Sequence, residues 1–357
     1  MKRIAIVVTN LAGSGAEKVA LAQAKLFNDK GHKVVLFLLE DIKTYDIERF
    51  SFPVVALTRK KDTYKFLGRF GDLIYARLLQ KKMQTYGSFD MVISNLPRAD
   101  RVVKHIKHLN KYFVIHTAYQ TELNNFSPTR SKEKRKGYQY LYRDEKLITV
   151  TDAMKEDLLT IGIRYKSIQT IYNPFDFSHI RKKVEEKLEE KSEGDYIVVL
   201  SAFRKEKRYD VLLDAVKMLH CDIRLIICAK YHAGLQKMID DRGLNYRVKI
   251  IGFVQNPYQY IKHARLLVLS SEREGLPTVL IESLIVGTPV VSTDCPTGPR
   301  EILTGELSQY LAKVNDSGDL AKKIDLALKQ YPPIENRYIE KFNAEKVYTQ
   351  FVKLLPA

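Results

Sequence analysis

The chain has 357 residues, a length at which two domains are more usual than one hydrophobic core. Its hydrophobic fraction of 45% and charged fraction of 28% are those of a globular protein, which excludes a fibrous or largely disordered chain. The net charge is +17, and residues 1–172 alone hold 31 Lys and Arg against 17 Asp and Glu, so the first half is predicted to meet an anionic partner.

The apolar runs are too short to span a bilayer, because the longest have the length of strands: Ile4–Val8, Val34–Leu39 and Leu266–Leu269. The first of these runs reaches polar Thr9 too soon for the core of a signal peptide. The three cysteines provide neither a disulfide framework nor a C-x-x-C zinc pair. The expectation is a soluble, reduced, cytoplasmic protein.

The first half predicts alternating strands and helices. Ile4–Val8 reads as a buried strand, Glu17–Asn28 as a helix after a glycine-containing turn, and Val34–Leu39 as the next strand. Further strand-like runs follow at Phe89–Ser94, Tyr112–Ile115 and Leu147–Val150. This alternation predicts an α/β fold with a doubly wound parallel sheet, whose ligands bind at the carboxyl ends of the strands.

Two segments concentrate the positive charge of this half, Thr58–Gln84 and Thr129–Lys146. Both mix basic residues with aromatic or aliphatic ones, a composition typical of helices that lie on an anionic membrane surface. The alternative for each is an ordinary solvated helix face. Nucleic acid is disfavoured as the anionic partner, because the sequence has no zinc finger, RNA-recognition strand or basic region with heptads.

A domain boundary is predicted after Asn173–Asp176, where a polar, highly charged segment begins at Ser178. Beyond it strands and helices alternate again from Tyr196, and one final helix is expected over Ile334–Leu355. The sequence thus predicts a basic first domain over 1–175, a second domain over 176–333, and a C-terminal helix over 334–357 that packs back on the first domain. The cleft between two such domains is the default ligand site.

The stretch Ser270–Gly287 is the most informative for chemistry. A strand ends in a loop with Glu274 and Gly275, Pro277 is expected as the first helical residue, and Gly287 ends the helix. The amides of the first helical turn form a site for a diphosphate. Glu282 lies eight positions after Glu274, so the two acids can reach hydroxyl groups on opposite sides of that diphosphate.

This stretch resembles the E-x7-E motif of glycosyltransferase family 4, retaining enzymes of GT-B architecture with two Rossmann-like domains that face each other across a cleft. Four more segments resemble family motifs in the same order along the chain: Gly13–Lys18, Asn173–Asp176, Gly252-Phe253 and Thr297–Ile302. The resemblance covers nearly the whole chain and is strongest over residues 201–302.

The resemblance implies a role for each matching residue. Glu274, His116 and Lys207 are the implied catalytic residues: Glu274 holds the transferred sugar, Lys207 binds the diphosphate, and His116 lies near the sugar. Glu282 is the implied ligand of the donor ribose. The remaining implied donor-binding residues are Gly15, Arg204, Phe253, Gly275, Leu276, Pro277, Thr278 and Val279.

One position departs from the family pattern, because Ala202 stands where an arginine usually binds the diphosphate. Arg204 or Arg300 is a candidate to replace that charge. The family implies catalysis without a metal or other cofactor, which agrees with the lack of an Asp-x-Asp motif. It also implies front-face retention, so Glu274 is not expected to be a covalent nucleophile.

These features predict a glycosyltransferase that moves a hexose or N-acetylhexosamine to a growing cell-surface glycan or lipid-linked oligosaccharide at the inner face of the cytoplasmic membrane. A UDP-sugar is the preferred donor and a GDP-sugar the second choice. The resemblance extends to enzymes of bacterial polysaccharide and lipopolysaccharide synthesis through Pro296–Ile302. Two alternatives remain: a nucleotide-sugar epimerase of the same architecture, and a non-catalytic protein that binds polyanions or RNA.

Overall fold

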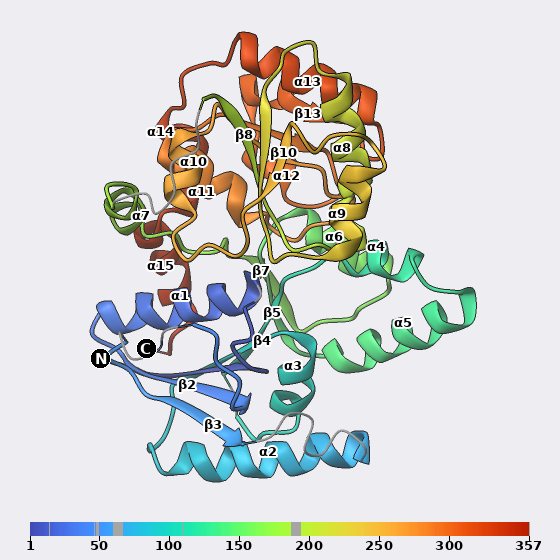
Figure 1. Cartoon of the computed structure of the whole chain (residues 1–357). Coiled ribbons are helices and arrows are strands. Elements are labelled where there is room, and N and C mark those ends of the chain that lie inside the picture. Colours follow the sequence, from blue (N-terminus) through green and yellow to red (C-terminus); the bar gives the residue numbers. More distant parts are fainter. Residues whose placement is uncertain are drawn as a thin grey trace. The chain divides into compact units, whose positions relative to one another are not determined.

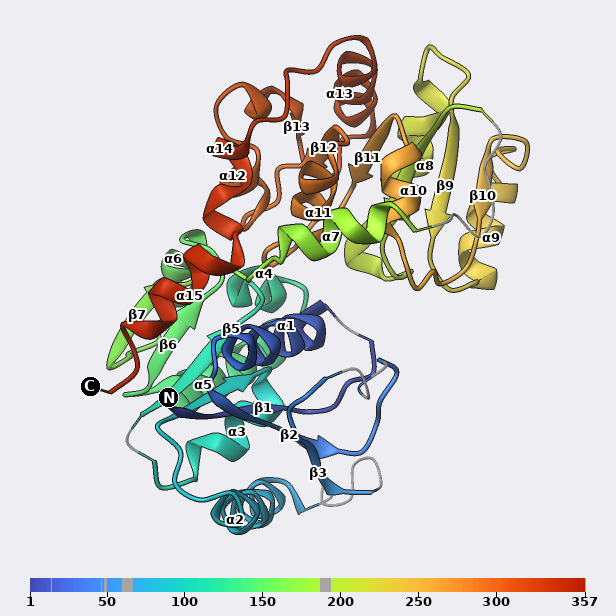
Figure 2. The ribbon, with the colours of Figure 1, turned by 90° about the vertical axis from the view of Figure 1, so that its left-hand side faces the viewer.

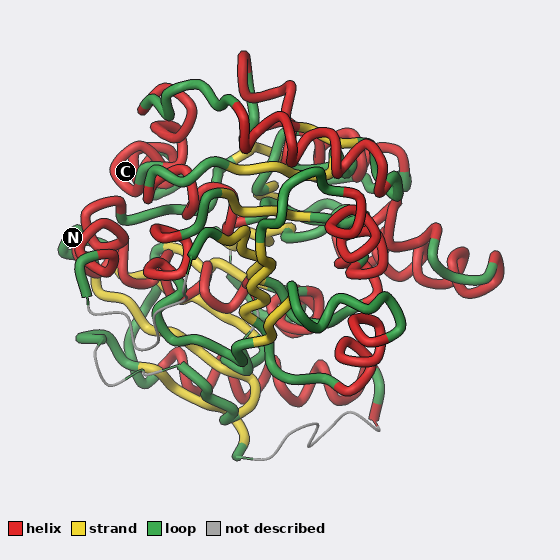
Figure 3. The backbone as a smooth tube through the Cα atoms, turned by 45° about the horizontal axis from the view of Figure 1, so that its top comes forward, coloured by secondary structure: helices red, strands yellow, loops and turns green. Residues whose placement is uncertain are grey.

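The computed structural model describes residues 1–13, 15–45, 47, 50–59, 67–108, 110–186 and 194–356. The chain divides into two compact units. Unit 1 comprises residues 1–175 and 344–357, and unit 2 comprises residues 176–343. Strands and helices alternate along the chain in both units, as Figure 3 shows by colour. The predicted α/β class, with one parallel sheet in each unit, is confirmed.

Unit 1 contains a seven-stranded parallel sheet in the order β3-β2-β1-β4-β5-β6-β7. Residues 4–8 of the central strand β1 are fully buried, as expected for a strand covered on both faces. The strands are β1 (Arg3–Val8), β2 (Lys33–Glu40), β3 (Val54–Thr58), β4 (Met91–Asn95), β5 (Lys111–Ile115), β6 (Lys146–Thr149) and β7 (Ser167–Thr170).

Helices cover both faces of this sheet (Figures 1 and 2). One face carries α1 (Gly15–Asp29) and α15 (Ala344–Val352), and the other carries α2 (Arg69–Gln84), α3 (Pro97–Lys104) and α5 (Pro128–Tyr142). Two shorter helices, α4 (Tyr119–Asn124) and α6 (Ala153–Thr160), pack against each other. The rings of Phe27 and Phe351 lie 5.3 Å apart and attach α15 to α1.

Unit 2 contains a six-stranded parallel sheet in the order β10-β9-β8-β11-β12-β13. The inner strands β9, β8 and β11 are mostly apolar and buried, as expected for strands covered on both faces. The six strands are β8 (Tyr196–Leu200), β9 (Arg224–Cys228), β10 (Val248–Ile250), β11 (Leu266–Leu269), β12 (Val290–Thr293) and β13 (Leu311–Ala312).

The helices of unit 2 form two groups (Figure 1). One group comprises α8 (Tyr209–Met218), α9 (Ala233–Asp240) and α13 (Ser317–Lys329), and the other comprises α7 (Phe177–Val184), α10 (Tyr258–His263) and α11 (Thr278–Val286). The shorter elements are η2 (Lys205–Lys207), α12 (Pro299–Ile302), η3 (Gly305–Tyr310), α14 (Asn336–Ile339) and η4 (Glu340–Phe342).

The single C-terminal helix predicted over Ile334–Leu355 is wrong. The segment forms α14, η4 and α15 instead, and the helical path is interrupted at Asn343, whose backbone is extended. Ala344 N donates a hydrogen bond to Phe175 O at 3.0 Å, where the chain returns to unit 1. Residues 334–343 therefore belong to unit 2, and only residues 344–357 belong to unit 1.

Each of the two basic segments contains one long helix. Within Thr58–Gln84, Thr58 ends β3 and α2 begins at Arg69, while residues 60–66 lie outside the described residues. The second segment forms α5 over Pro128–Tyr142. The charged segment after the boundary forms α7, and residues 187–193 lie outside the described part of the chain.

Candidate active site

The sheet of unit 2 has a topological switch point between β8 and β11. The strand order runs β10-β9-β8 on one side of this point and β11-β12-β13 on the other. In such a sheet the loops that follow the two central strands diverge and leave a crevice for a ligand. The loop after β8 carries Lys207, and the loop after β11 carries Glu274. The fold therefore places two of the predicted site residues at the position where a ligand is expected.

Lys207 and Glu274 form an ion pair across this switch point. Lys207 Nζ lies 2.5 Å from Glu274 Oε1, and the side chains retain 21% and 12% exposure. Ser271 Oγ donates a second hydrogen bond to the same oxygen at 2.6 Å. The carboxylate is thus held by two donors while both charged groups still reach solvent, and a ligand can contact either one.

The loop that carries Glu274 is supported from the turn at Thr297-Gly298. Thr297 Oγ1 donates to Glu274 O at 2.6 Å. Gly298 has φ +94°, and a Cβ placed there would lie 2.5 Å from Pro277 Cδ and still closer to Gly275 O. Only glycine allows this approach, because any side chain would meet backbone as well as adopt a strained conformation. Gly298 therefore fixes the position of the Glu274 loop.

Helix α11 begins at Thr278, and Pro277 is its N-cap, so the prediction that Pro277 is the first helical residue is wrong by one position. No side chain in the described part of the chain caps this helix start. The amides of Thr278 and Val279 are therefore not used by a side-chain cap at the positive end of the helix dipole, as an anion site requires. Gly287 ends the helix with φ +91°, as predicted.

Glu282 lies inside α11 and is only 3% exposed. Tyr258 Oη, on α10, donates a hydrogen bond to Glu282 Oε1 at 3.3 Å. Because a buried carboxylate is costly unless it is hydrogen-bonded, this contact stabilises and orients the acid. Tyr258 is a residue that the sequence motifs do not reveal as part of the site.

The other predicted donor-binding residues of unit 2 follow strands of the same sheet. Phe253 comes shortly after β10 and is 67% exposed, while Leu276 is buried. Arg204 precedes η2, and its side chain is 62% exposed and lies 4.0 Å from Glu206. The guanidinium of Arg300 is paired with Asp294, Nε to Oδ1 at 2.7 Å.

Arg208 is a cation near Lys207 that sequence reasoning misses. Its backbone is left-handed, with φ +47°, where η2 meets α8. Its guanidinium pairs with Asp210 at 2.6 Å and lies 3.6 Å from Glu272, in the loop of Glu274. Its position directly after Lys207 was a hint in the sequence. The motif ends at Lys207, however, so it assigns no role to Arg208.

In unit 1 the switch point lies between β1 and β4. Gly13, after β1, has φ +107°, and its amide donates to Glu17 Oε2 at 2.7 Å. Gly15 begins α1, and a Cβ at Gly15 would have no other atom within 4 Å, so space is open above it. Ser14 lies outside the described residues.

His116 directly follows β5 at the same edge of this sheet. Its Nε2 lies 2.8 Å from Asn95 Oδ1, and Asn95 Nδ2 donates to Gln23 Oε1 at 3.3 Å. Because the carbonyl of Asn95 faces the ring, Nε2 carries the proton and Nδ1 keeps its lone pair. Burial lowers the pKa of His116 to about 4, so the ring is neutral near pH 7.

Two family models match the chain. The model of glycosyltransferase family 4 matches residues 13–179, and the model of glycosyl transferases group 1 matches residues 180–345. Together they cover nearly the whole chain without overlap.

Sequence relatives are named as glycosyltransferases. An N-acetylgalactosaminyltransferase of Campylobacter jejuni that acts on N-acetylgalactosamine-N,N'-diacetylbacillosaminyl-diphospho-undecaprenol is 25% identical over 90% of this chain and 88% of its own length. An uncharacterized glycosyltransferase of Methanocaldococcus jannaschii is 31% identical over 48% of this chain. That second match spans less than half of the relative, 45% of its length.

Among solved structures, Anabaena HepE in complex with UDP and glucose has a TM-score of 0.79 at 21% identity, with 99% of both chains covered. Staphylococcus aureus TarM, in a complex that contains UDP, has a TM-score of 0.76 at 14% identity, with 100% of both chains covered. These likenesses show the shared fold. The chain therefore belongs to the glycosyltransferases of GT-B architecture, with a family 4 domain followed by a group 1 domain.

Proposed function

We propose that this glycosyltransferase moves a hexose or N-acetylhexosamine from a nucleotide-diphosphate sugar to a bacterial surface glycan or a lipid-linked oligosaccharide, with retention at the anomeric carbon. The Lys207–Glu274 ion pair at the β8/β11 switch point carries this proposal. A cation that suits a diphosphate lies there beside an acid that suits sugar hydroxyl groups, and this supports the proposal.

The donor is bound through three groups of unit 2. Lys207 and the first amides of α11 bind the diphosphate, Glu282 binds the ribose, and the Glu274 loop binds the sugar. The burial of Glu282 and its orientation by Tyr258 support a role in binding a neutral diol. A UDP-sugar is preferred, which the complex of Anabaena HepE with UDP and glucose supports. A GDP-sugar is the second choice.

In the transfer step the bond between the sugar and the diphosphate breaks, and negative charge accumulates on the departing phosphate. Lys207 and the α11 amides stabilise that charge. The acceptor hydroxyl attacks from the same face and gives its proton to the leaving phosphate. Glu274, already held by two donors, orients the sugar rather than bonding to it. His116 accepts a hydrogen bond at Nδ1 from a hydroxyl group of the sugar.

The acceptor is proposed to meet unit 1. The Campylobacter jejuni relative acts on an undecaprenol-diphosphate-linked saccharide, and an Escherichia coli relative, 25% identical over 64% of this chain, is a lipopolysaccharide 1,6-galactosyltransferase. Acceptors of this kind lie at an anionic membrane surface, which fits the basic first half of the chain.

Peripheral attachment to the inner face of the cytoplasmic membrane follows from the same proposal. Phe70 and Leu73 of α2 are 74% and 40% exposed, and they lie on a helix that also carries Arg69, Arg77 and two lysines. Such a combination suits the interface of an anionic leaflet. None of the described helices has both the length and the apolar composition needed to cross a bilayer.

The deciding experiment incubates the protein with UDP- and GDP-sugars, with and without a lipid-linked saccharide, and identifies the products by mass spectrometry. Sugar transfer with unchanged rates in EDTA supports the proposal, including the expected absence of a metal requirement. Interconversion of the donor without an acceptor would favour the epimerase. Salt-sensitive retention of polyanions without nucleotide-sugar binding would favour a non-catalytic binder.

A further inference from the structure

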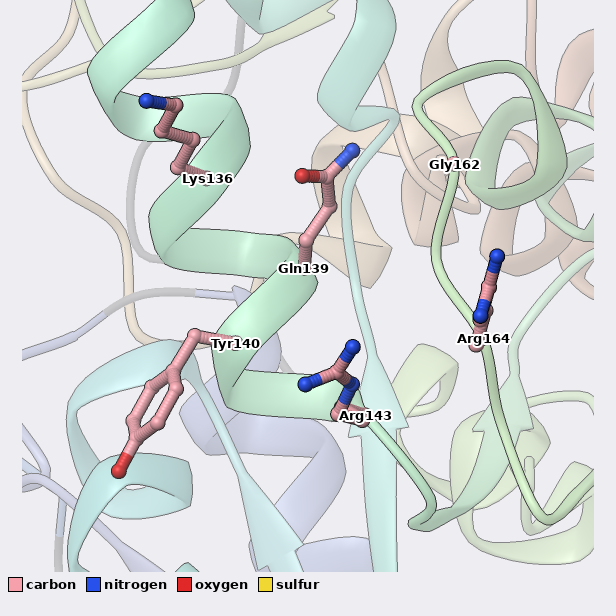
Figure 4. Close-up of a pocket in the computed structure, with 6 residues that line it drawn as sticks. All are labelled: Lys136, Gln139, Tyr140, Arg143, Gly162 and Arg164. Atoms are coloured by element: carbon pink, nitrogen blue, oxygen red, sulfur yellow. The ribbon is translucent and has the colours of Figure 1, made fainter.

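A second polar pocket lies in unit 1, beside the C-terminal half of α5 (Figure 4). We call it the α5 pocket. It has a volume of about 410 Å³. Four of its lining residues come from α5 and the position after it, and two come from the segment between α6 and β7: Lys136, Gln139, Tyr140, Arg143, Gly162 and Arg164.

The charged side chains that line the α5 pocket are all positive. Lys136, Arg143 and Arg164 are exposed, and within the described ranges none of them has a carboxylate within 4.0 Å. Two neighbouring carboxylates pair with other cations, Glu145 with Lys104 at 3.2 Å and Glu122 with Lys134 at 2.9 Å. In Figure 4 the side chains of Arg143 and Arg164 lie on the same side of α5, whereas Lys136 extends on the other side, so the two guanidinium groups are the candidate anion site.

The walls of the pocket are held in place. Gln139 Nε2 donates to Ile161 O at 2.8 Å, which ties α5 to the opposite segment. Gly162 has φ +78°, and a Cβ there would lie 2.9 Å from Gln139 Nε2, so a larger residue would disturb this tie. The Arg69 guanidinium and the Lys104 ammonium lie 5.0 and 5.5 Å from the centre of the Tyr140 ring.

The pocket is separate from the candidate active site of unit 1. Helix α5 leads into the start of β6, and the segment with Gly162 and Arg164 leads into the start of β7. The pocket therefore lies at the amino ends of these strands. Gly13, Gly15 and His116 follow the carboxyl ends of β1 and β5. A ligand in the α5 pocket cannot be the sugar that His116 contacts.

We propose that the α5 pocket binds phosphate groups, as a second anion site that does not take the sugar donor. The guanidinium groups of Arg143 and Arg164 are donors that phosphate oxygens accept, and the rigid fork of arginine favours phosphate over a spherical anion. The phosphate belongs either to the headgroup of an anionic lipid or to a soluble phosphate-bearing molecule. Binding of a lipid headgroup rests on the proposed membrane attachment, whereas binding of a soluble phosphate does not.

The chain has no tryptophan, so Tyr140→Trp creates a single fluorescent reporter in the wall of the pocket. Titration with inorganic pyrophosphate, and separately with vesicles of phosphatidylglycerol and phosphatidylcholine in equal parts, should change its emission. Arg143→Ala with Arg164→Ala in the same chain should weaken the response about tenfold or more. The control pair, Lys132→Ala with Lys166→Ala, removes the same charge from residues outside the pocket lining. Most of the fluorescence response should remain in this control.

Pyrophosphate and the vesicles together distinguish a soluble phosphate from a lipid headgroup as the source of the bound phosphate. A response to vesicles alone identifies a lipid headgroup, a response to pyrophosphate alone identifies a soluble phosphate, and a response to both identifies a general phosphate site. No response to either probe, or equal weakening by the two pairs of substitutions, overturns the proposal. Calorimetry with pyrophosphate on Lys207→Ala, which removes the donor-site cation and retains Tyr140, provides a second measurement if the reporter variant is unstable.

Failure of this inference is distinguishable from failure of the proposed function. Binding of UDP-sugars, measured by thermal shift on the same proteins, should be unchanged by Arg143→Ala with Arg164→Ala. Donor binding that persists while the reporter stays silent contradicts only the α5 pocket. A reporter response without any binding of nucleotide sugars contradicts the proposed function and leaves the pocket intact.

Discussion

Lys207 Nζ lies 2.5 Å from Oε1 of Glu274, although 67 residues separate them in the chain. The contact joins the loops that follow the two strands on either side of the switch point of unit 2. In the absence of a donor each side chain neutralises the other. Under the proposed function, a bound diphosphate would compete with Glu274 for the lysine, and the sugar hydroxyl groups would compensate the acid. The ion pair therefore keeps both groups in position for the ligand.

Substitution Lys207→Ala should lower kcat/KM for a nucleotide-sugar donor by about 10²-fold, because the charge that develops on the leaving diphosphate loses its main cation. Steady-state transfer rates measure the effect. Lys205→Ala is the matched control, since Lys205 is exposed on the same η2 turn and has no assigned role. Equal losses in both variants would contradict a specific function of Lys207.

Substitution Gly298→Ala should weaken donor binding through the Glu274 loop. The new Cβ would be 2.5 Å from Pro277 Cδ and closer to Gly275 O, and the residue would have to keep φ near +94°. The expected cost is about 1–3 kcal/mol. Thermal unfolding with and without UDP separates the two effects. Gly318→Ala is the control, because its Cβ would meet only Asp316 Oδ1 at an ordinary 3.5 Å.

The buried acid of α11 gives a graded prediction. Glu282→Gln should reduce donor affinity by about tenfold or more, because a charge-assisted hydrogen bond to the ribose becomes a neutral one. Tyr258→Phe should reduce it less, by several-fold, since it removes only the hydrogen bond that orients the carboxylate. Isothermal titration with UDP measures both, and an unchanged affinity in Glu282→Gln would exclude the proposed ribose contact.

A buried acid in unit 1 predicts a pH dependence of stability. Burial raises the pKa of Asp100 to about 7, against the lowering effect of hydrogen bonds from Ser94 Oγ at 2.6 Å and Tyr142 Oη at 2.8 Å. The folded state then holds a proton that the unfolded state releases above pH 3.8. The contribution of Asp100 to stability is full below that pH and is lost as the pH rises to 7, by about 1 kcal/mol per pH unit.

The contribution of His116 to stability changes with pH in the opposite direction, because the pKa of its ring is lowered to about 4 from 6.5. Its contribution is full above pH 6.5 and is lost as the pH falls to 4, so the two slopes oppose each other between these values. Asp100→Asn should therefore make the free energy of unfolding rise more steeply with pH than in the parent chain. Denaturant unfolding at several pH values tests this, and parallel curves for the two proteins would contradict it.

The sequence predicts the second unit better than the first, because the informative residues of the second unit lie close together in the chain. The Glu274–Glu282 spacing, Gly287 and Lys207 all lie within short segments whose conformation neighbouring residues determine. The strands β3 and β7 went unnoticed because their residues are mostly half-buried and form no continuous apolar run. The two-residue strand β13 is too short for any pattern.

Contacts between distant residues were also beyond prediction. Gln23 and Asn95 are 72 positions apart, and nothing in their local sequence indicates that one orients the other beside His116. The same holds for the support of Glu274 by Thr297 and for the orientation of Glu282 by Tyr258. Such pairings arise only when the helices and strand ends of a folded unit pack together.

The hydrogen bond from Ala344 N to Phe175 O means that the chain leaves unit 1 for unit 2 and returns to unit 1 at neighbouring points. Residues 176–343 are therefore a continuous segment inserted into unit 1, and the residues of unit 1 on its two sides are hydrogen-bonded to each other. Under the proposed function, exchange of residues 176–343 between related enzymes would change the donor while the sheet of unit 1 and helix α15 stay intact. New glycan structures could then arise by swapping modules rather than by altering each active-site residue in turn.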